Sequence, residues 1–538
     1  MIRARRVAAA SLTAVLAVAL SVAGATAAQA HSVGGSPGDL SPRTHFTMAA
    51  DGSSGLTQGG EGIPNIDIVK KTIATYYGDP GTGLADMTSS PYISEMTKIT
   101  SRVKAKLASY YKASARTGKT PAIVVDTDDT MLMTYDMEVG DMHFVFTPQE
   151  QDVWVKGKKF PATPGMVDLV DTARRIGFDV IGITGRSADQ KPASIENVTD
   201  VGYHGFTAAN YYTKWADGQQ PSYITCATAK CTTVEFKALT RKHLENDLGY
   251  DIAVNIGDQW SDLQGGFADH DVKLPNPTYY LPSPDLPGVS EPRLAPHTQF
   301  QLKADGSSGL TQGGEGIPNI DVVKKTIATY YGDPGTGLAS TDGSPYMSEM
   351  TALLNRRVPA IAAECRTLAA KGEKPAIVLD ADDTTLWTYD MEVADMHFVF
   401  NPTTQNDDWV QPERFPATPG MVAATNTIRD AGCTMIGLTG RGADQKQATL
   451  GNLAKYYTGF TSENYYTKWA AGQQPSYITC ATVKCTTIEY KSQTRAYIET
   501  PAGGGYTIVA NVGDQFSDLI GTRADHTVKL PNPTYYLP

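Results

Sequence analysis

The sequence predicts an α/β protein of two tandem units, each a parallel sheet flanked by helices. Residues 51–85 recur at 305–339 with a single change, and both units end on VKLPNPTYYLP. Within each unit, short apolar runs alternate with segments of helical periodicity. Unbroken runs of four or five apolar residues are typical of strands buried on both faces of a parallel sheet. The duplication and the alternation together predict two α/β domains.

The chain of 538 residues is too long for one ordinary core and long enough for two domains. The repeat period is also far longer than that of a solenoid, so a stacked array is excluded. The segment SPDLPGVSEPRL favours an extended, solvated connection between the units. The predicted divisions are a signal peptide at 1–30, a first unit at 31–282, a linker at 283–294 and a second unit at 295–538.

The N-terminal segment has the pattern of a cleaved export signal. Arg3, Arg5 and Arg6 precede an apolar stretch at 7–22, and Ala-Gln-Ala ending at Ala30 is a cleavage site. The apolar stretch is short and broken by Ser and Thr, which argues against a retained membrane anchor. No later stretch is apolar enough to span a bilayer. We therefore expect a mature protein that is secreted and free of the membrane.

The composition of the chain limits the classes of molecule that it is expected to bind. At 41% hydrophobic and 19% charged residues the chain reads as a soluble globular protein. The net charge is −11, and no basic patch with interleaved aromatic residues is present. Nucleic acids bind mainly through their phosphate backbone, so a nucleic-acid partner is not expected.

Two short cysteine pairs agree with export. Cys226 and Cys231 lie in CATAKC, and Cys480 and Cys485 lie in CATVKC. In a secreted chain such a repeated pair predicts a small-loop disulfide. The alternative is a metal site, but a second ligand pair and a nearby His are lacking.

Two further cysteines, Cys365 and Cys433, occur in the second unit, where the first unit has Tyr111 and Phe178. Because both were gained together, they predict a third bridge that joins a helix to the entry of the next strand.

Helices and strands alternate in the first unit. Asn65 is a candidate cap for a helix over IDIVKKTIATYY, and 91–115 predicts a longer helix, with its counterpart at 345–368. The apolar runs that predict strands are 122–126, 180–184 and 252–258. Each run ends in a polar residue. The carboxyl ends of parallel strands meet at one sheet edge, so these polar residues are expected to converge there.

Four polar motifs follow in the same order in each unit. In the first unit they are Asp-Thr-Asp-Asp-Thr at 126–130, Thr-Gly-Arg at 184–186, Lys237 and Gly-Asp-Gln-Trp-Ser-Asp at 257–262. In the second unit they lie at 380–384, 439–441, Lys491 and 513–518. Solvated loop acids are the structural alternative. Several carboxylates at one sheet edge would repel one another without a cation, so the ordered set points to a catalytic site.

This order and chemistry resemble the haloacid dehalogenase (HAD) superfamily, and within it the secreted acid phosphatases of subfamily IIIB, which includes plant vegetative storage proteins. GDQWSDL and Thr-Gly-Arg indicate that branch, and the resemblance covers each unit from about 91 and 345 onward. It implies a HAD-like Rossmannoid fold in both units. Only 57 residues run from Thr130 to Arg186, which leaves room for at most a small cap. We therefore expect an open site and a broad range of phosphomonoesters.

The chemistry expected of the first motif is phosphoryl transfer. Asp126 and Asp380 would attack phosphorus and form an aspartyl-phosphate. Asp128 and Asp382 would protonate the leaving alkoxide and later deprotonate the attacking water. The next residues in sequence, Asp129 and Asp383, are out of phase and are assigned no catalytic role.

The other motifs supply positive charge and hydrogen bonds. Lys237 and Lys491 would offset charge on the nucleophile and phosphate, and Thr184 and Thr439 would donate to a phosphoryl oxygen. Arg186, like Arg441, either contacts the substrate or forms a structural salt bridge. His143 and His397 are expected to be packed or hydrogen-bonded residues and not bases. The aromatic segment NYYTKWA (210–216 and 464–470) either lines the substrate mouth or packs around an insertion.

A phosphate dianion among carboxylates requires a compensating hard cation with oxygen ligands. The resemblance implies Mg²⁺ held by Asp126, the backbone carbonyl of Asp128 and the side chain of Asp258, with Asp262 in support. The equivalents in the second unit are Asp380, Asp382, Asp514 and Asp518.

The sequence thus predicts a secreted, Mg²⁺-dependent acid phosphatase with two independent sites. A non-catalytic storage or binding protein is one alternative, whose mark would be loss of the nucleophile; both units keep it. A phosphotransferase that uses the same intermediate is another, and a third is that only one unit is active.

Overall fold

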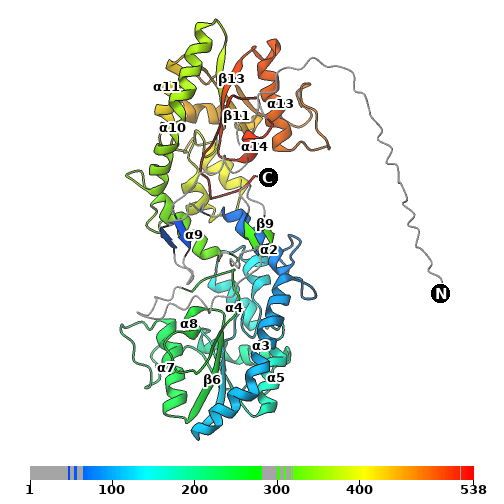
Figure 1. Ribbon diagram of the computed structural model, residues 1–538, viewed down its shortest axis with the longest axis vertical. Helices are drawn as coiled ribbons and strands as arrows, with labels where there is room; N and C mark the ends of the chain where they lie inside the picture. Colours follow the sequence, from blue (N-terminus) through cyan, green and yellow to red (C-terminus); the bar gives the residue numbers. More distant parts are fainter. Residues whose placement is uncertain are drawn as a thin grey trace, which may run out of the picture.

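Figure 1 shows the computed structural model, in which two α/β units follow one another along the chain. The structure describes residues 46–48, 54–56, 63, 65–281, 300–302, 308–310, 317, 319–521 and 523–537. The predicted signal peptide and linker lie outside the described residues. The boundaries proposed between units are therefore still predictions.

Each unit contains a five-stranded sheet whose neighbouring strands all run parallel. The first sheet has the order β5 (Tyr211–Tyr212), β4 (Asp179–Ile183), β3 (Thr120–Val125), β6 (Tyr250–Gly257), β7 (Asp271–Lys273). The second has the order β12 (Tyr465–Lys468), β11 (Thr434–Gly442), β10 (Pro375–Leu379), β13 (Thr507–Gly513), β14 (His526–Lys529). The predicted strands are β3, β4 and β6, so the expectation of a parallel sheet is confirmed.

Helices cover both faces of each sheet (Figure 1). Along β3, Ala122 and Val124 pack with the apolar face of α7, while Ile123 and Val125 join the cluster that contains α3 and α5. This alternation buries every residue of an apolar run. The helices of the first unit are α2 (Ile66–Tyr77), α3 (Pro91–Ser114), α4 (Pro148–Lys156), α5 (Met166–Ile176), α6 (Lys191–Asp200), α7 (Thr233–Asn246) and α8 (Trp260–Leu263). Those of the second are α9 (Ile320–Tyr331), α10 (Pro345–Ala370), α11 (Met421–Asp430), α12 (Lys446–Ala454), α13 (Thr487–Glu499) and α14 (Phe516–Leu519).

The units contact each other through their first helices and their final segments. Asn65 caps α2 as predicted, and its side-chain amide also donates to the carbonyl of Tyr535, 2.6 Å away in the second unit. Asn319 donates in the same way to the carbonyl of Tyr279 in the first unit, at 2.7 Å. Helices α2 and α9 also contact each other. A short hairpin in each unit contacts the first helix of the opposite unit; the hairpins are β1 (Phe46–Met48) with β2 (Ser54–Leu56) and β8 (Phe300–Leu302) with β9 (Ser308–Leu310). The contacts are reciprocal.

The three predicted disulfides are present. Cys365 of α10 is bonded to Cys433, which precedes β11, so the third bridge joins a helix to a strand entry as expected. At the same place in the first unit, the rings of Tyr111 and Phe178 pack edge to face with centroids 5.1 Å apart. An aromatic pair and a covalent bond thus occupy equivalent positions.

Replacing Cys365 and Cys433 by Ala lowers the free energy of unfolding of the second unit by about 4 kcal/mol, since this bridge closes a loop of 68 residues. The control pair, Cys226→Ala with Cys231→Ala, opens a loop of 5 residues and costs about 2 kcal/mol. Denaturant unfolding of the full chain, followed by circular dichroism, measures both. Equal losses in the two variants would contradict the loop-length argument.

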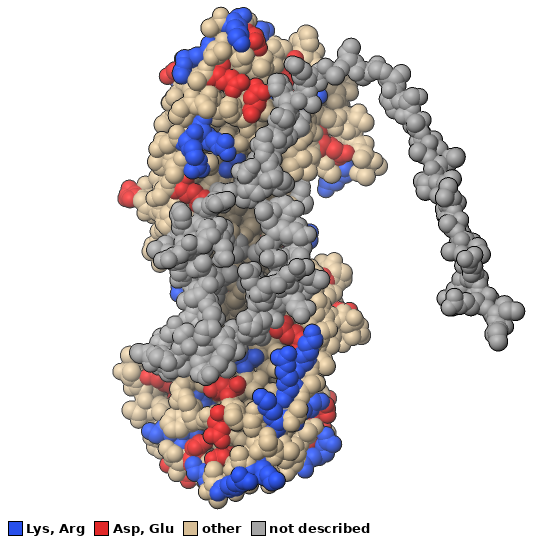
Figure 2. Space-filling view, in the orientation of Figure 1, with Lys and Arg blue, Asp and Glu red and all other residues tan. Residues whose placement is uncertain are grey.

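Among the described residues no helix is both long and apolar enough to cross a bilayer. On the face in Figure 2, acidic and basic side chains are intermixed over the described surface of both units. A surface of mixed sign gives no broad positive field for a nucleic-acid backbone.

Candidate active site

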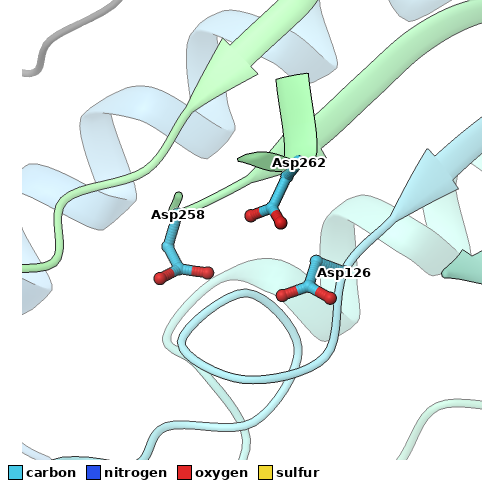
Figure 3. A group of neighbouring side chains, drawn as sticks. All are labelled: Asp126, Asp258 and Asp262. Carbon is cyan, nitrogen blue, oxygen red and sulfur yellow. The ribbon is translucent and has the colours of Figure 1, made fainter. Parts of the chain in front are cut away.

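A buried carboxylate cluster lies at the carboxyl edge of each sheet. Asp126 follows β3, Asp258 follows β6 and Asp262 lies in α8, and the three side chains converge in Figure 3. One oxygen from each lies within 4.8 Å of the others. Asp380, Asp514 and Asp518 form the same cluster in the second unit. Neighbouring parallel strands therefore bring together the residues that the motifs placed far apart in sequence.

Lys237 neutralises part of this cluster. It reaches from α7 and donates from Nζ to Oδ1 of Asp126 at 2.8 Å and to Oδ1 of Asp262. Lys491 pairs with Asp380 at 3.0 Å and with Asp518 at 2.5 Å. Burial alone would lower the pKa of Lys237, but the two carboxylates raise it above its ordinary value, so the amine is an ammonium.

The cluster retains an excess of negative charge. Burial raises the pKa of Asp126 well above its usual range, Lys237 opposes the rise, and the nearby aspartates add to it. Burial and Asp262 raise the pKa of Asp258 to about 6. Converging buried carboxylate oxygens are ligands that suit a hard divalent cation. The single ammonium among them offsets part of their negative charge. The residues therefore fit the predicted metal site.

Asp258 is oriented by several donors. It accepts hydrogen bonds from Oγ1 of Thr130 at 3.2 Å, Nε2 of Gln259 at 2.8 Å, Nδ2 of Asn276 at 2.8 Å and the hydroxyl of Tyr279 at 3.3 Å. Asn276 and Tyr279 belong to the repeated ending VKLPNPTYYLP and were missed by the motif argument. The verbatim recurrence of that ending was the available signal. Ligand carboxylates held by such partners keep a fixed orientation.

Asp129 lies behind Asp258 and shares the amide of Asn276 with it. It has a φ of 49°, in the left-handed region that Asp tolerates better than most residues. Its carboxylate accepts from the backbone N of Thr134 at 3.0 Å and from Asn276 at 3.1 Å. Burial and the charge of Asp258 raise its pKa to about 8. These contacts fix the loop that follows β3, and the absence of a catalytic role for Asp129 is still a prediction.

Arg186 forms a bidentate salt bridge with Asp128. Its Nη2 lies 2.6 Å from Oδ1 and its Nε lies 3.1 Å from Oδ2, while Nη1 donates to Ser194 at 2.9 Å. Arg441 binds Asp382 in the same way, at 2.6 Å and 3.1 Å. Of the two roles left open by the sequence, the structure shows the salt bridge. Arg186 therefore fixes the side chain predicted to be the acid and base.

Thr184 lies beside this pair. Its Oγ1 accepts from the backbone N of Arg186 at 3.3 Å, and its side chain is fully buried at the end of β4. Thr439 has the same contact with Arg441, at 3.2 Å. The structure thus places the threonines next to the Arg–Asp pair.

The two units differ at the residue that follows the predicted nucleophile. Thr127 shares a hydrogen bond of 2.5 Å with the hydroxyl of Tyr211. Ala381 replaces Thr127 in the second unit, and the buried hydroxyl of Tyr465 has no hydrogen-bond partner among the described residues. The residues predicted to be catalytic are the same in both units.

The site of the second unit faces a cavity of 1070 Å³. Asp380, Asp382 and Lys491 line it, and so does Lys468 of the NYYTKWA segment, which favours the substrate-mouth interpretation there. His143 of the first unit also lines this cavity; it is exposed, and its Nδ1 is hydrogen-bonded to the carbonyl of Val139 at 3.1 Å, so of the two expectations the hydrogen-bonded one holds. Residues of the first unit therefore line this cavity together with those of the second, and the open site is still a prediction.

The parallel sheet, the aspartate cluster at its carboxyl edge and the buried lysine define an α/β protein of the HAD class. Residues 84–282 and 340–538 each match the family described as HAD superfamily, subfamily IIIB (Acid phosphatase). The chain belongs to this family, as the motifs predicted.

Curated relatives include plant proteins. Acid phosphatase 1 of Solanum lycopersicum is 30% identical over 162 residues, which cover 29% of this chain and 58% of the relative. Vegetative storage protein 1 of Arabidopsis thaliana is 31% identical over 30% of this chain and 55% of its own length. The chain thus spans a little over half the length of these relatives. The structure of the class C acid phosphatase from Bacillus anthracis aligns with 20% identity and a TM-score of 0.29, covering 40% of this chain and 86% of that one.

Proposed function

We propose that this protein is a secreted phosphomonoesterase that requires Mg²⁺, works through an aspartyl-phosphate and accepts a broad range of substrates. The observation that carries the proposal is the pairing of buried Asp126 with Lys237 beside Asp258, repeated in the second unit. The family supports phosphatase chemistry. The export pattern at the N-terminus and the disulfides support secretion.

The reaction would proceed in two displacements. A carboxylate oxygen of Asp126 attacks phosphorus, the bond to the leaving alkoxide breaks, and Asp128 gives that alkoxide a proton. Asp128 then takes a proton from water, the water oxygen attacks phosphorus, and the bond to Asp126 breaks to release phosphate. To reach the substrate, Asp128 gives up at least one of its hydrogen bonds to Arg186. Lys237 holds Asp126 in place and offsets its charge.

The metal would be held by Asp126, the backbone carbonyl of Asp128 and Asp258, with Asp262 behind them. When bound, it supplies the positive charge that lets a phosphate dianion approach these carboxylates.

A non-catalytic storage role is the second candidate, favoured by the vegetative storage protein among the relatives. The retention of Asp126 and Lys237, and of Asp380 and Lys491, argues against it. A phosphotransferase shares every residue above and differs in the acceptor. The ratio of free phosphate to phosphorylated alcohol, measured with added glycerol, separates it from a hydrolase.

Removing the metal with EDTA lowers hydrolysis of p-nitrophenyl phosphate by about 100-fold or more, and adding Mg²⁺ in excess restores it. The reason is that the carboxylate cluster then repels the substrate. Release of p-nitrophenolate measures the rate, and a panel of aryl and alkyl phosphates tests the breadth of substrate. Thermal unfolding with and without EDTA controls for loss of fold. Full activity in EDTA would contradict the metal requirement.

A further inference from the structure

Helix α2 belongs to the first unit at one end and to the second unit at the other. Near its C-terminus, the ring of Tyr77 stacks on that of Tyr135 with centroids 4.2 Å apart. At its N-terminus, the backbone N of Ile66 donates to the carbonyl of Pro533 at 2.9 Å. Lys70 adds a hydrogen bond to the carbonyl of Phe398, again in the second unit. The helix is therefore fixed across the boundary between the units.

Helix α9 makes the matching contacts in the opposite direction. Tyr331 stacks on Tyr389 at 4.2 Å within its own unit, and the backbone N of Ile320 donates to the carbonyl of Pro277 at 2.9 Å. Lys324 donates to the carbonyl of Phe144. Because the same bonds occur twice, this exchange of contacts between the units follows from the repeated sequence.

The exchange carries first-unit residues to the second catalytic site. The cavity of 1070 Å³ that exposes Asp380 and Lys491 is also lined by α2. Lys71 and Ala74 lie on that wall, and the side chain of Lys71 is exposed. A positive side chain in a cavity that receives an anionic substrate raises the local substrate concentration.

We propose that each catalytic site takes its substrate-facing wall from the other unit. Lys71 and Ala74 serve the second site, and their equivalents in the repeat, Lys325 and Ala328, serve the first. This inference rests on the proposed phosphatase function. The catalytic groups of the two sites are separate, but their binding walls are exchanged. Lys71 attracts the phosphomonoester, and the small side chain of Ala74 leaves room for its leaving group.

The test uses the full chain with one nucleophile removed at a time. Asp126→Asn leaves only the second site, and Asp380→Asn leaves only the first. In the Asp126→Asn background, Lys71→Glu raises KM for p-nitrophenyl phosphate about tenfold with little change in kcat. In the Asp380→Asn background, Lys325→Glu has that effect. Lys98→Glu, the same charge reversal on the exposed face of α3, controls for the overall charge of the protein.

A steric pair tests the same wall without a change of charge. Ala74→Trp lowers kcat/KM of the second site at least about tenfold, and Ala328→Trp does so for the first site. A variant that failed to fold would lose activity in both backgrounds, which separates misfolding from obstruction. Substitutions that affect the site of their own unit, or neither site, would overturn the exchanged wall and leave the phosphatase function standing. Absence of hydrolysis in the wild type would overturn both.

Discussion

Replacing both Asp126 and Asp380 by Asn abolishes hydrolysis of p-nitrophenyl phosphate, with a fall in kcat on the order of 10⁴-fold or more. Asn has nearly the shape of Asp, but its amide cannot form the phosphoryl bond. Each replaced aspartate is buried and paired with a lysine, so the neutral amide weakens that pair, and urea unfolding of the variants controls for a loss of fold. Release of p-nitrophenolate at saturating substrate measures the loss.

The single variants separate the two sites. Each retains the activity of the unit that it leaves intact, and the two residual rates add up to the wild-type rate. Acid quenching with ³²P-labelled substrate traps the aspartyl-phosphate in the wild type and in each single variant. A double variant that still turns over substrate near the wild-type rate would refute Asp126 and Asp380 as nucleophiles. A single variant with no activity would instead show that only one unit is competent.

The core of the site could be predicted from sequence because two simple rules apply to it. Unbroken apolar runs identified β3 and β6, and parallel strands present the residues after their carboxyl ends at one edge. Asp126 and Asp258 therefore had to lie close together. The bridge from Cys365 to Cys433 could be predicted for a similar reason, since two cysteines that appear together have few other partners.

Asn276 could not be found by those rules. It lies between two prolines and reads locally as part of a turn, yet its amide joins Asp129 to Asp258. For His143 the sequence left open whether the side chain is packed or hydrogen-bonded, and the structure shows an exposed ring hydrogen-bonded to the carbonyl of Val139. The backbone has positive φ at His143 and Phe144, and this local geometry buries Phe144 while it exposes the histidine. Hydrophobic pattern alone does not encode such a reversal.

The exchange of α2 and α9 was hidden by the duplication itself. The two helices are almost identical in sequence, and the periodicity of each predicts a buried face. Such a pattern does not show that the C-terminal end of the helix packs in its own unit while the N-terminal end contacts the other. That arrangement depends on the connection between the copies and on the final segment of each unit, which binds the first helix of its neighbour.

Lys491→Met reduces both the stability and the activity of the second unit. Lys491 is buried and pairs with Asp380 and Asp518, so its loss leaves two buried carboxylates without their ammonium. Breaking such a buried pair costs about 3–5 kcal/mol of unfolding free energy. In the Asp126→Asn background, kcat falls about 10²–10³-fold because the charge near the attacking oxygen is no longer offset.

Lys491→Arg distinguishes charge from shape in the same background. Arg keeps the positive charge, so we expect most of the stability lost in Lys491→Met to return. Its planar guanidinium does not match the position of Nζ between the two carboxylates, so we expect kcat to stay low. Urea unfolding and p-nitrophenolate release, measured on the same preparations, give both quantities. If Lys491→Met unfolded at the same urea concentration as the wild type, another group would have to offset the negative charge of the two carboxylates. That result would contradict the stabilising role of Lys491.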